Sequence, residues 1–293
     1  MDVIAIFGPT GVGKTTVALA LADRLRARGE DPVAVSADAL QVYRGLEILT
    51  GVASAEEQRQ LEHRLVSFLA VTETFSAGRY AALAHAEIDG LLAAGRRPIV
   101  VGGTGLYLRA ALAELDLRPP VSEGTRARLE ARGAGDLFAE LEWRASHLAE
   151  RVDPSDTRKL ARSLALLDEG IEYPPAQEEL WTAATRHPTR LVALTVEREA
   201  LRAAIDARVD AMVAAGAADE VRAAAAAGAS PTARQALGFE QLLAGDVEAM
   251  KRRTRQYARR QVTWLRKLAG AEVLDVTGRS PEAVAAAIDS RGP

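Results

Sequence analysis

The chain of 293 residues contains no cysteine. Disulfide bonds, thiol nucleophiles and thiolate metal sites are therefore excluded. Histidine is scarce as well, because the chain has four histidines that are scattered along it and never stand at the His-x-x-x-His spacing of a helical zinc site. These two shortages argue against chemistry that depends on sulfur or on zinc.

Long apolar runs are also missing. No run approaches the roughly 20 residues that a helix needs to span a bilayer, and no basic segment at the N-terminus introduces a signal peptide. We therefore expect a soluble cytoplasmic protein that has no membrane partner.

Neither sign of charge is in clear excess. Lys and Arg total 37 against 40 Asp and Glu, which gives a net charge of -3. The overall charge thus gives no indication of a nucleic-acid partner, and any basic binding site must be local.

Short apolar runs alternate with helical patterns in the first 120 residues. We expect strands at 3–7, 32–36 and 98–103, with a helix after the first run and another over 79–94. This alternation predicts an α/β fold in which a parallel sheet is flanked by helices on both faces.

The pattern changes after Pro119-Pro120, where only helical stretches follow until a strand pattern returns near residue 190. Further helices are expected over 199–227 and a last strand over 271–277. We therefore predict an α/β core formed by 1–120 and 190–293 and interrupted by a small all-helical insertion, 121–189.

A glycine-rich stretch, GPTGVGKT at 8–15, lies between the first expected strand and a helix. Gly8-x-x-x-x-Gly13-Lys14-Thr15 fits the P-loop pattern, in which backbone N–H groups and a helix N-terminus hold phosphate oxygens. Lys14 supplies a positive charge, and the Thr15 hydroxyl can ligate Mg²⁺. The stretch predicts a site for a di- or triphosphate and leaves open whether the rest of the ligand is a nucleotide.

Two further segments follow expected strands and should reach the same edge of the sheet. Asp38 comes directly after the second strand, and Gly102-Gly103-Thr104-Gly105 comes directly after the third. Ligands of parallel sheets bind beyond the carboxyl ends of the strands. Asp38 is then either a general base or the N-cap of the next helix, and the Thr104 hydroxyl can reach a phosphate oxygen unless this is an ordinary glycine-rich turn.

One helix, expected over 246–269, carries a local excess of positive charge. Its segment KRRTRQYARRQVTWLRK, residues 251–267, has eight basic residues and no acidic residue. Tyr257, Trp264, Leu265 and Leu268 recur near helical spacing and would face the core. The basic side chains then either face water or contact a polyphosphate or nucleic-acid backbone, which would position a nucleic acid without reading its bases.

Several of these segments together resemble the tRNA dimethylallyltransferase family, also called tRNA isopentenyltransferases. The matching stretches occur in the family's order from about residue 5 to residue 267: GPTGVGKT, SADALQVYRGLEI, FSAGRY, GGTGLYLRAAL, DPSDTRKLARSL, TARQALGFEQ and TRQYARRQVTWLR. SAD-x-x-QVYRG, GGTGLY and TRQYARRQ-x-TWLR are specific to the family and are not general P-loop features.

The resemblance implies an enzyme that transfers a dimethylallyl group from dimethylallyl diphosphate to N6 of an adenosine. That adenosine lies immediately 3′ of the anticodon, in tRNAs that read codons starting with U. The P-loop would then hold the diphosphate of the allylic donor, with Mg²⁺ as cofactor at Thr15. The partners would be the donor and the tRNA anticodon stem-loop, and we expect a monomer.

The resemblance also implies roles for single residues. Asp38, Thr104 and Lys14 would be catalytic, with Asp38 taking the proton of the N6 amine. The expected diphosphate contacts are Thr10, Gly11, Val12, Gly13, Lys14, Thr15 and either Arg234 or Gln235. The expected tRNA contacts are Asp38, Ala39, Leu40, Gln41, Thr104, Arg158, Lys159, Leu160, Ala161 and Arg162, with the helical insertion gripping the stem-loop.

The chain departs from the family pattern at several positions. Ala39 stands where the family often has Ser, and Phe239 where it usually has Tyr. An Ile-Gly-Thr-Ala-Lys pattern is replaced by Ile-Leu-Thr-Gly-Val at 48–52, and His-His-Leu-Ile-Asp by His-Arg-Leu-Val-Ser at 63–67. These differences bear on substrate affinity and tRNA choice more than on the reaction type.

Three other functions fit parts of the sequence. A small-molecule or nucleoside kinase would share the P-loop and use Asp38 as a base for a hydroxyl group, with ATP as donor. An adenylate isopentenyltransferase would share the donor and accept a free nucleotide. A divergent member could bind RNA without catalysis, although Lys14, Thr15, Asp38 and Thr104 are all present.

Overall fold

A computed structural model of the chain describes residues 2–115, 117, 121–171 and 182–290. The chain divides into two compact units, one formed by Met1–Asp116 with Glu179–Pro293 and the other by Leu117–Glu178. The expected insertion extended from 121 to 189, and its residues 172–181 lie outside the described residues, as does the Pro119-Pro120 pair.

The first unit is built on a six-stranded sheet in the order β3-β2-β4-β1-β5-β6, in which every pair of neighbours is parallel. Its strands are β1 Val3–Phe7, β2 Pro32–Ala37, β3 His63–Arg64, β4 Arg97–Gly102, β5 Thr189–Thr195 and β6 Glu272–Asp275. The sequence predicts all of these strands except β3, whose two residues are too few to show a pattern.

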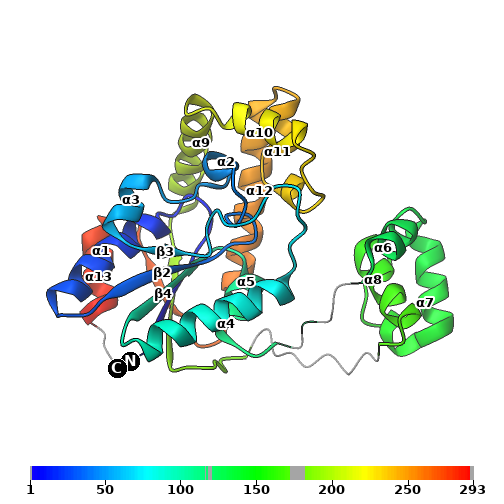
Figure 1. The fold of residues 1–293 in the computed structure, drawn as a ribbon, viewed down its shortest axis with the longest axis horizontal. Coiled ribbons are helices and arrows are strands. Elements are labelled where there is room, and N and C mark those ends of the chain that lie inside the picture. The colour runs from blue at the N-terminus through cyan, green and yellow to red at the C-terminus, as the bar shows by residue number, and fades with distance from the viewer. Residues whose placement is uncertain (1, 116, 118–120, 172–181, 291–293) are drawn as a thin grey trace. The chain divides into compact units, whose positions relative to one another are not determined.

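Helices cover both faces of this sheet (Figure 1). Helix α1 packs against α13 and α4 packs against α5. The described helices of the first unit are α1 Lys14–Ala27, α2 Glu47–Thr50, α3 Ala55–Gln60, α4 Ala77–Ala93, α5 Gly105–Leu112, α9 Arg198–Ala214, α10 Ala217–Ala226, α11 Phe239–Leu243, α12 Val247–Leu265 and α13 Pro281–Ser290, with a 3-10 turn at Ala233–Gln235.

Burial on both faces explains why the central strands are continuously apolar. All five residues of β1 are buried, as parallel strands covered by helices require. Helix α1 places Val17, Leu21 and Leu25 on one side, at the i, i+4, i+8 spacing that faces a core. The predicted α/β class with a parallel sheet and flanking helices is confirmed.

The second unit contains three described helices, α6 Glu123–Glu130, α7 Ala134–Ala149 and α8 Thr157–Asp168. Leu137 and Leu141 of α7 and Leu160 and Leu164 of α8 are fully buried in a core that this unit forms by itself. The i, i+4 spacing within each pair places both leucines of a helix on one face. Helix α7 is kinked at Ala145, whose backbone angles are not helical.

Among the described residues, no helix is both long enough and apolar enough to cross a membrane.

Candidate functional site

Three neighbouring strands, β1, β4 and β2, end at the same level of the sheet. In the strand register Phe7 of β1 pairs with Gly102 of β4, and Gly102 also pairs with Ala37 of β2. The next residues, Gly8, Asp38 and Gly103, therefore leave the sheet side by side at its carboxyl edge. The sheet thus brings together the glycine-rich stretch, the acidic residue and the GGTG turn that the sequence singles out.

The glycine-rich loop surrounds the ammonium group of Lys14. Lys14 Nζ donates hydrogen bonds to the carbonyl oxygens of Gly8 at 2.9 Å and Pro9 at 3.1 Å. Burial, and then the nearby Arg208, lower the pKa of Lys14 from 10.5 to about 8, although the charge of Asp38 opposes this shift. Burial disfavours the charged form of Lys14, and an anion that approaches the ammonium group stabilises that charged form. This environment suits a phosphate site.

Gln261 of α12 joins the glycine-rich loop to the GGTG turn. Its Oε1 accepts a hydrogen bond from the backbone N–H of Thr10, and its Nε2 donates one to the carbonyl of Gly103, both at 2.8 Å. The approach is so close that a Cβ on Gly103 would lie 2.5 Å from Gln261 Nε2 and 3.0 Å from Gly8 O. Glycine at 103 is therefore required for the two segments to pack together.

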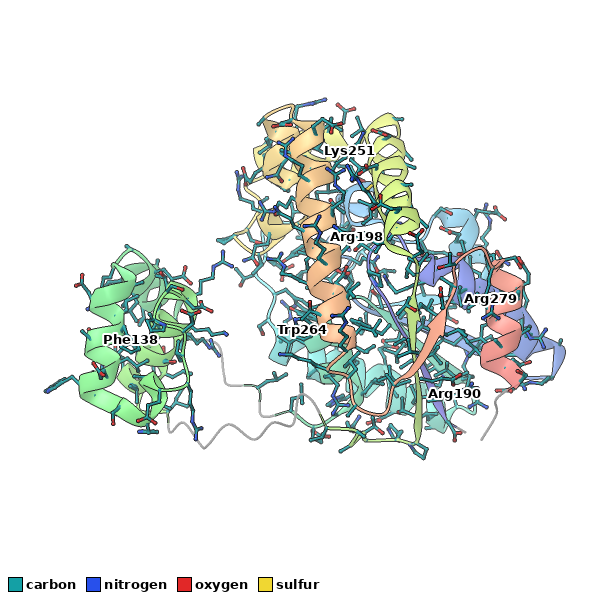
Figure 2. The ribbon with its side chains drawn as sticks, turned by 180° about the vertical axis from the view of Figure 1, so that it is seen from behind. Phe138, Arg190, Arg198, Lys251, Trp264 and Arg279 are labelled. Atoms are coloured by element: carbon teal, nitrogen blue, oxygen red, sulfur yellow. The ribbon has the colours of Figure 1, made fainter. Side chains whose placement is uncertain are left out.

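Thr104 begins α5 and faces a second side chain of α12. The hydroxyl groups of Thr104 and Tyr257 are 2.8 Å apart, and either can donate. Burial and the charge of Asp38 raise the pKa of Tyr257 to about 12, so this phenol keeps its proton at neutral pH. Trp264, two helical turns beyond Tyr257, packs where a Cβ on Gly105 would otherwise lie, and Figure 2 shows Trp264 near the end of α12 opposite to Lys251.

Asp38 lies between cations and phenols. Its Oδ1 accepts a hydrogen bond from the backbone N–H of Leu40 at 2.9 Å, so one oxygen closes the turn after β2. Burial and then the charge of Asp38 raise the pKa of Tyr80, and burial, Tyr43 and then Asp38 raise the pKa of Tyr107; the two rings are 4.8 Å apart. The carboxylate is thus close to protonated phenols and retains a second oxygen that can accept a proton.

Arg208 is a site residue that the sequence did not indicate. It lies on α9, it is half-buried, and its Nε is buried with no hydrogen-bond partner among the described residues. Burial lowers its pKa, an effect that the charges of Asp38 and Glu57 oppose. A guanidinium beside Lys14 with unused donors forms the second cation of an anion site.

A signal for these missed residues is present in the helix periodicity. Gln261 falls on the buried face of α12 together with Met250, Ala258 and Leu265, and a buried amide needs partners. Arg208 similarly follows Leu201 and Ile205 at the spacing of the apolar side of α9. Gln261 and Arg208 can both be identified from the sequence as polar residues that fall on the apolar side of a helix.

The other expected contacts near Asp38 are partly used within the protein. Gln41 Oε1 accepts a hydrogen bond from the Ser36 hydroxyl at 2.8 Å, and its Nε2 donates one to Gly51 O at 3.0 Å. Ala39 and Leu40 are half-buried in the turn that Asp38 closes. Gln41 therefore holds this turn against the end of α2, and its role toward tRNA stays a prediction.

The expected diphosphate contact at 234–235 is placed on a separate surface turn. Arg234 pairs with Glu240 at 2.8 Å and lies over the ring of Phe239, while Gln235 is exposed. Among the described residues, neither side chain forms a hydrogen bond with the glycine-rich loop, so their role stays a prediction. Arg208 is an arginine whose charge acts on Lys14 of this loop.

The expected tRNA segment of the second unit divides into two groups of side chains. Leu160 and Ala161 are fully buried in the core of that unit, so their side chains support the helix. Arg158 and Lys159 are exposed, and Arg162 is half-buried. Only these three basic side chains can reach a ligand, and their role in tRNA binding stays a prediction.

The donor groups near the loop fit Mg²⁺ better than a metal held wholly by protein. No cluster of three or more His, Asp or Glu residues that could hold a metal ion occurs in the described ranges. Mg²⁺ in phosphate sites is bound by one or two protein oxygens together with phosphate oxygens and water. The Thr15 hydroxyl, in the first turn of α1, matches that requirement.

Helix α12 separates its basic residues into two groups. Lys251 pairs with Asp210 at 2.7 Å and Arg255 pairs with Asp206, which ties this side of the helix to α9. Arg253 and Arg260 instead share the face of Tyr257, at the i, i+4 and i, i+3 spacings. Arg260 lies 5.6 Å from the centre of the Tyr257 ring, so this face continues the rim of the site.

Comparisons with known proteins agree on one family. A family model described as IPP transferase matches residues 41–268. A tRNA dimethylallyltransferase of Thermobifida fusca is 40% identical over 280 residues, which cover 90% of this chain and 87% of the relative. One of Anaeromyxobacter dehalogenans is 40% identical over 306 residues, covering 99% of this chain and all of the relative.

Solved structures give the same result. The tRNA isopentenylpyrophosphate transferase of Bacillus halodurans has a TM-score of 0.71 and 30% identity, covering 99% of this chain and 94% of that chain. A eukaryotic dimethylallyltransferase acting on tRNA has a TM-score of 0.75, covers 94% of this chain and 74% of that chain, and at 24% identity supports the fold alone.

Proposed function

The chain belongs to the IPP transferase family, and from this premise we propose that it is a tRNA dimethylallyltransferase. It transfers the dimethylallyl group of dimethylallyl diphosphate to N6 of the adenosine immediately 3′ of the anticodon. The tRNAs concerned read codons that start with U. The enzyme acts in the cytoplasm, where tRNA serves translation, and as a monomer.

The diphosphate of the donor binds to the glycine-rich loop. Backbone N–H groups of Gly11 and of residues 13–15, at the N-terminus of α1, bind its oxygens, while Lys14 and Arg208 supply two positive charges. Thr15 would hold Mg²⁺, which would neutralise charge on the bound diphosphate. The loop and the two cations lower the barrier because they stabilise the charge that develops as diphosphate leaves.

The acceptor amine is deprotonated by Asp38. The lone pair of N6 is delocalised into the adenine ring, so the amine is a poor nucleophile until its proton is removed. As the bond from N6 to C1 of the dimethylallyl group forms, the bond from C1 to the diphosphate oxygen breaks. One N6 proton passes to the Asp38 carboxylate and diphosphate leaves.

Thr104 and Tyr257 form the opposite wall of this reaction space. Their hydroxyl groups share one hydrogen bond, and burial keeps Tyr257 protonated near neutral pH, so one of them always has a hydrogen to donate to a phosphate oxygen. The adenosine enters from the anticodon loop, which is single-stranded and can give up a base at a cost of a few kcal/mol.

Contacts with the rest of the tRNA are assigned to Arg253 and Arg260 of α12 and to Arg158, Lys159 and Arg162 of the second unit. These groups meet phosphates, and they therefore position the RNA without reading its sequence. We assign the gripping of the anticodon stem-loop to the second unit.

One observation carries the proposal. Asp38, the glycine-rich loop and the GGTG turn follow strand residues that are paired in register. A candidate base therefore lies beside a phosphate site. A phosphate site alone would fit a kinase equally well, and the family assignment decides in favour of prenyl transfer.

The test is a product assay with Mg²⁺ and dimethylallyl diphosphate, in which unmodified tRNA and AMP are offered in parallel. Nucleosides are then read by mass spectrometry. The proposal predicts a gain of C5H8 on adenosine in tRNA only. A gain on AMP would identify an adenylate isopentenyltransferase, and no gain on either acceptor, with tRNA still bound, would identify an RNA-binding protein without catalysis.

A further inference from the structure

The guanidinium of Arg208 lies against the backbone of Gly51, in a space that any other residue at 51 would fill. A Cβ on Gly51 would overlap Arg208 Nη2, would lie 2.9 Å from Arg208 Cζ and would lie 3.2 Å from Met212 Cε. The contact joins α9 to the loop that follows α2, two segments that are more than 150 residues apart in the sequence.

The backbone at Gly51 is held firmly from several sides. Gly51 ends α2 in the left-handed conformation, with φ 64°, and its carbonyl accepts a hydrogen bond from Gln41 Nε2 at 3.0 Å. The start of α2 is fixed by the Glu220 carboxylate, which accepts from the N–H groups of Ile48 and Leu49 at 2.9 Å each. A side chain at 51 would therefore displace the mobile end of Arg208 and leave the loop in place.

The position of this guanidinium affects the phosphate site directly. Gly51, against which Arg208 lies, is joined through Gln41 to the turn that Asp38 closes, and the charge of Arg208 contributes to the lowered pKa of Lys14. The Nε atom of Arg208 is buried without a partner among the described residues. A displaced guanidinium would lose its place beside Lys14, and the site would lose one of its two cations.

We propose that Gly51 is a positioning residue of the donor site, because the missing side chain at 51 lets the Arg208 guanidinium lie beside Lys14, where it contacts the diphosphate. The inference rests on the proposed binding of dimethylallyl diphosphate.

The test compares Gly51→Ala with Gly95→Ala. Gly95 also has a left-handed backbone, with φ 71°, and a Cβ there would meet nothing within 4 Å. Both variants therefore carry the same kind of backbone strain, and only Gly51→Ala disturbs Arg208. We measure the inhibition constant of inorganic pyrophosphate and the KM of dimethylallyl diphosphate at saturating tRNA, together with the Kd of tRNA and the melting temperature.

Gly51→Ala should weaken inhibition by pyrophosphate about tenfold to hundredfold, the range expected when a charged hydrogen bond is lost. The KM of the donor should rise by a similar factor, while the Kd of tRNA stays unchanged. Gly95→Ala should lower the melting temperature to a similar extent and leave pyrophosphate inhibition as in the wild type. Equal inhibition constants for Gly51→Ala and the wild type would overturn the inference.

A double-mutant cycle with Arg208→Met separates an effect through Arg208 from general damage. In the Arg208→Met background, Gly51→Ala should have no further effect on pyrophosphate inhibition, because the displaced group is already absent. A loss as large as in the wild-type background would contradict the inference. A wild-type protein that transfers no dimethylallyl group would instead contradict the proposed function on which the inference rests.

Discussion

Asp38 has two roles at the scale of single residues, and they use different properties of its carboxylate. One oxygen accepts the Leu40 N–H and closes a turn, which an uncharged amide oxygen would do equally well. Taking a proton from the acceptor amine requires the carboxylate itself. The two roles can therefore be separated by substitution.

Asp38→Asn should lower kcat by about 10²–10⁴-fold, the range for a lost general base, with little change in melting temperature or tRNA affinity. Asp38→Ala should lose the turn as well as the base, so it should be equally inactive and less stable. Single-turnover rates, melting curves and tRNA titrations of both variants measure this. Wild-type turnover in Asp38→Asn would show that Asp38 is only a cap.

The lowered pKa of Lys14 predicts a loss of donor capture in alkaline solution. The free enzyme loses the Lys14 proton as the pH rises through about 8, and a neutral amine no longer attracts diphosphate. With saturating tRNA, kcat/KM for dimethylallyl diphosphate reports ionisations of the enzyme–tRNA complex before the donor binds, so it should fall above about pH 8. Lys14→Arg, whose charge persists, should not show this fall, and an identical profile in both proteins would exclude Lys14 as its cause.

The same ionisation predicts the sign of a stability change. The pKa of Lys14 is lower in the folded protein than its usual 10.5, so the unfolded chain binds more protons between these pH values. The contribution of Lys14 to the free energy of unfolding is therefore unfavourable below pH 8 and improves as the pH rises toward 10.5.

At the scale of elements, α12 connects chemistry and RNA binding, because one helix supplies Gln261 to the loop, Tyr257 to Thr104 and arginines to the surface. The sequence predicts this helix from its charge and its apolar spacing. It does not predict which basic residues are engaged, because Asp206 and Asp210 lie on another helix and meet Arg255 and Lys251 only in the folded chain. Arg208 was not predicted because it meets Gly51 only in the folded chain.

Arg253→Gln and Arg260→Gln should each weaken tRNA binding and lower the slope of log Kobs against log salt by about 0.7–0.9, the value for one lost phosphate contact. Arg259→Gln is the matched control, because Arg259 is exposed on a different face of α12 and should change the slope less. Titrations of tRNA at several salt concentrations measure these slopes. Equal slopes for all three variants would contradict the assignment of the Tyr257 face to RNA.

At the scale of the whole molecule, the chain combines a sheet-based unit that contains the proposed chemistry with a helical unit that has its own core. The alternation of strands and helices was sufficient to predict the sheet, since buried parallel strands are apolar throughout. The two-residue strand β3 depends on its pairing with β2, and α2 depends on the Glu220 cap, neither of which local sequence reveals.

Leu164→Ala should destabilise the second unit by about 2–5 kcal/mol, the cost of a cavity in a packed core, because Leu164 is fully buried there. We expect weaker tRNA binding and an unchanged inhibition constant for pyrophosphate. Hydrogen exchange of α7 and α8 confirms which unit is affected. Unchanged tRNA affinity in a variant with an unfolded second unit would refute its role in gripping the RNA.

The central claim is that the glycine-rich loop holds the diphosphate of an allylic donor and not a nucleotide that gives up phosphate. The most direct measurement incubates the protein, Mg²⁺ and unmodified tRNA with either radiolabelled dimethylallyl diphosphate or γ-labelled ATP, and counts label in RNA and released diphosphate. The account predicts label from the allylic donor only, with one diphosphate released for each modified adenosine. Transfer of the γ-phosphate to any acceptor, without allyl transfer, would contradict it.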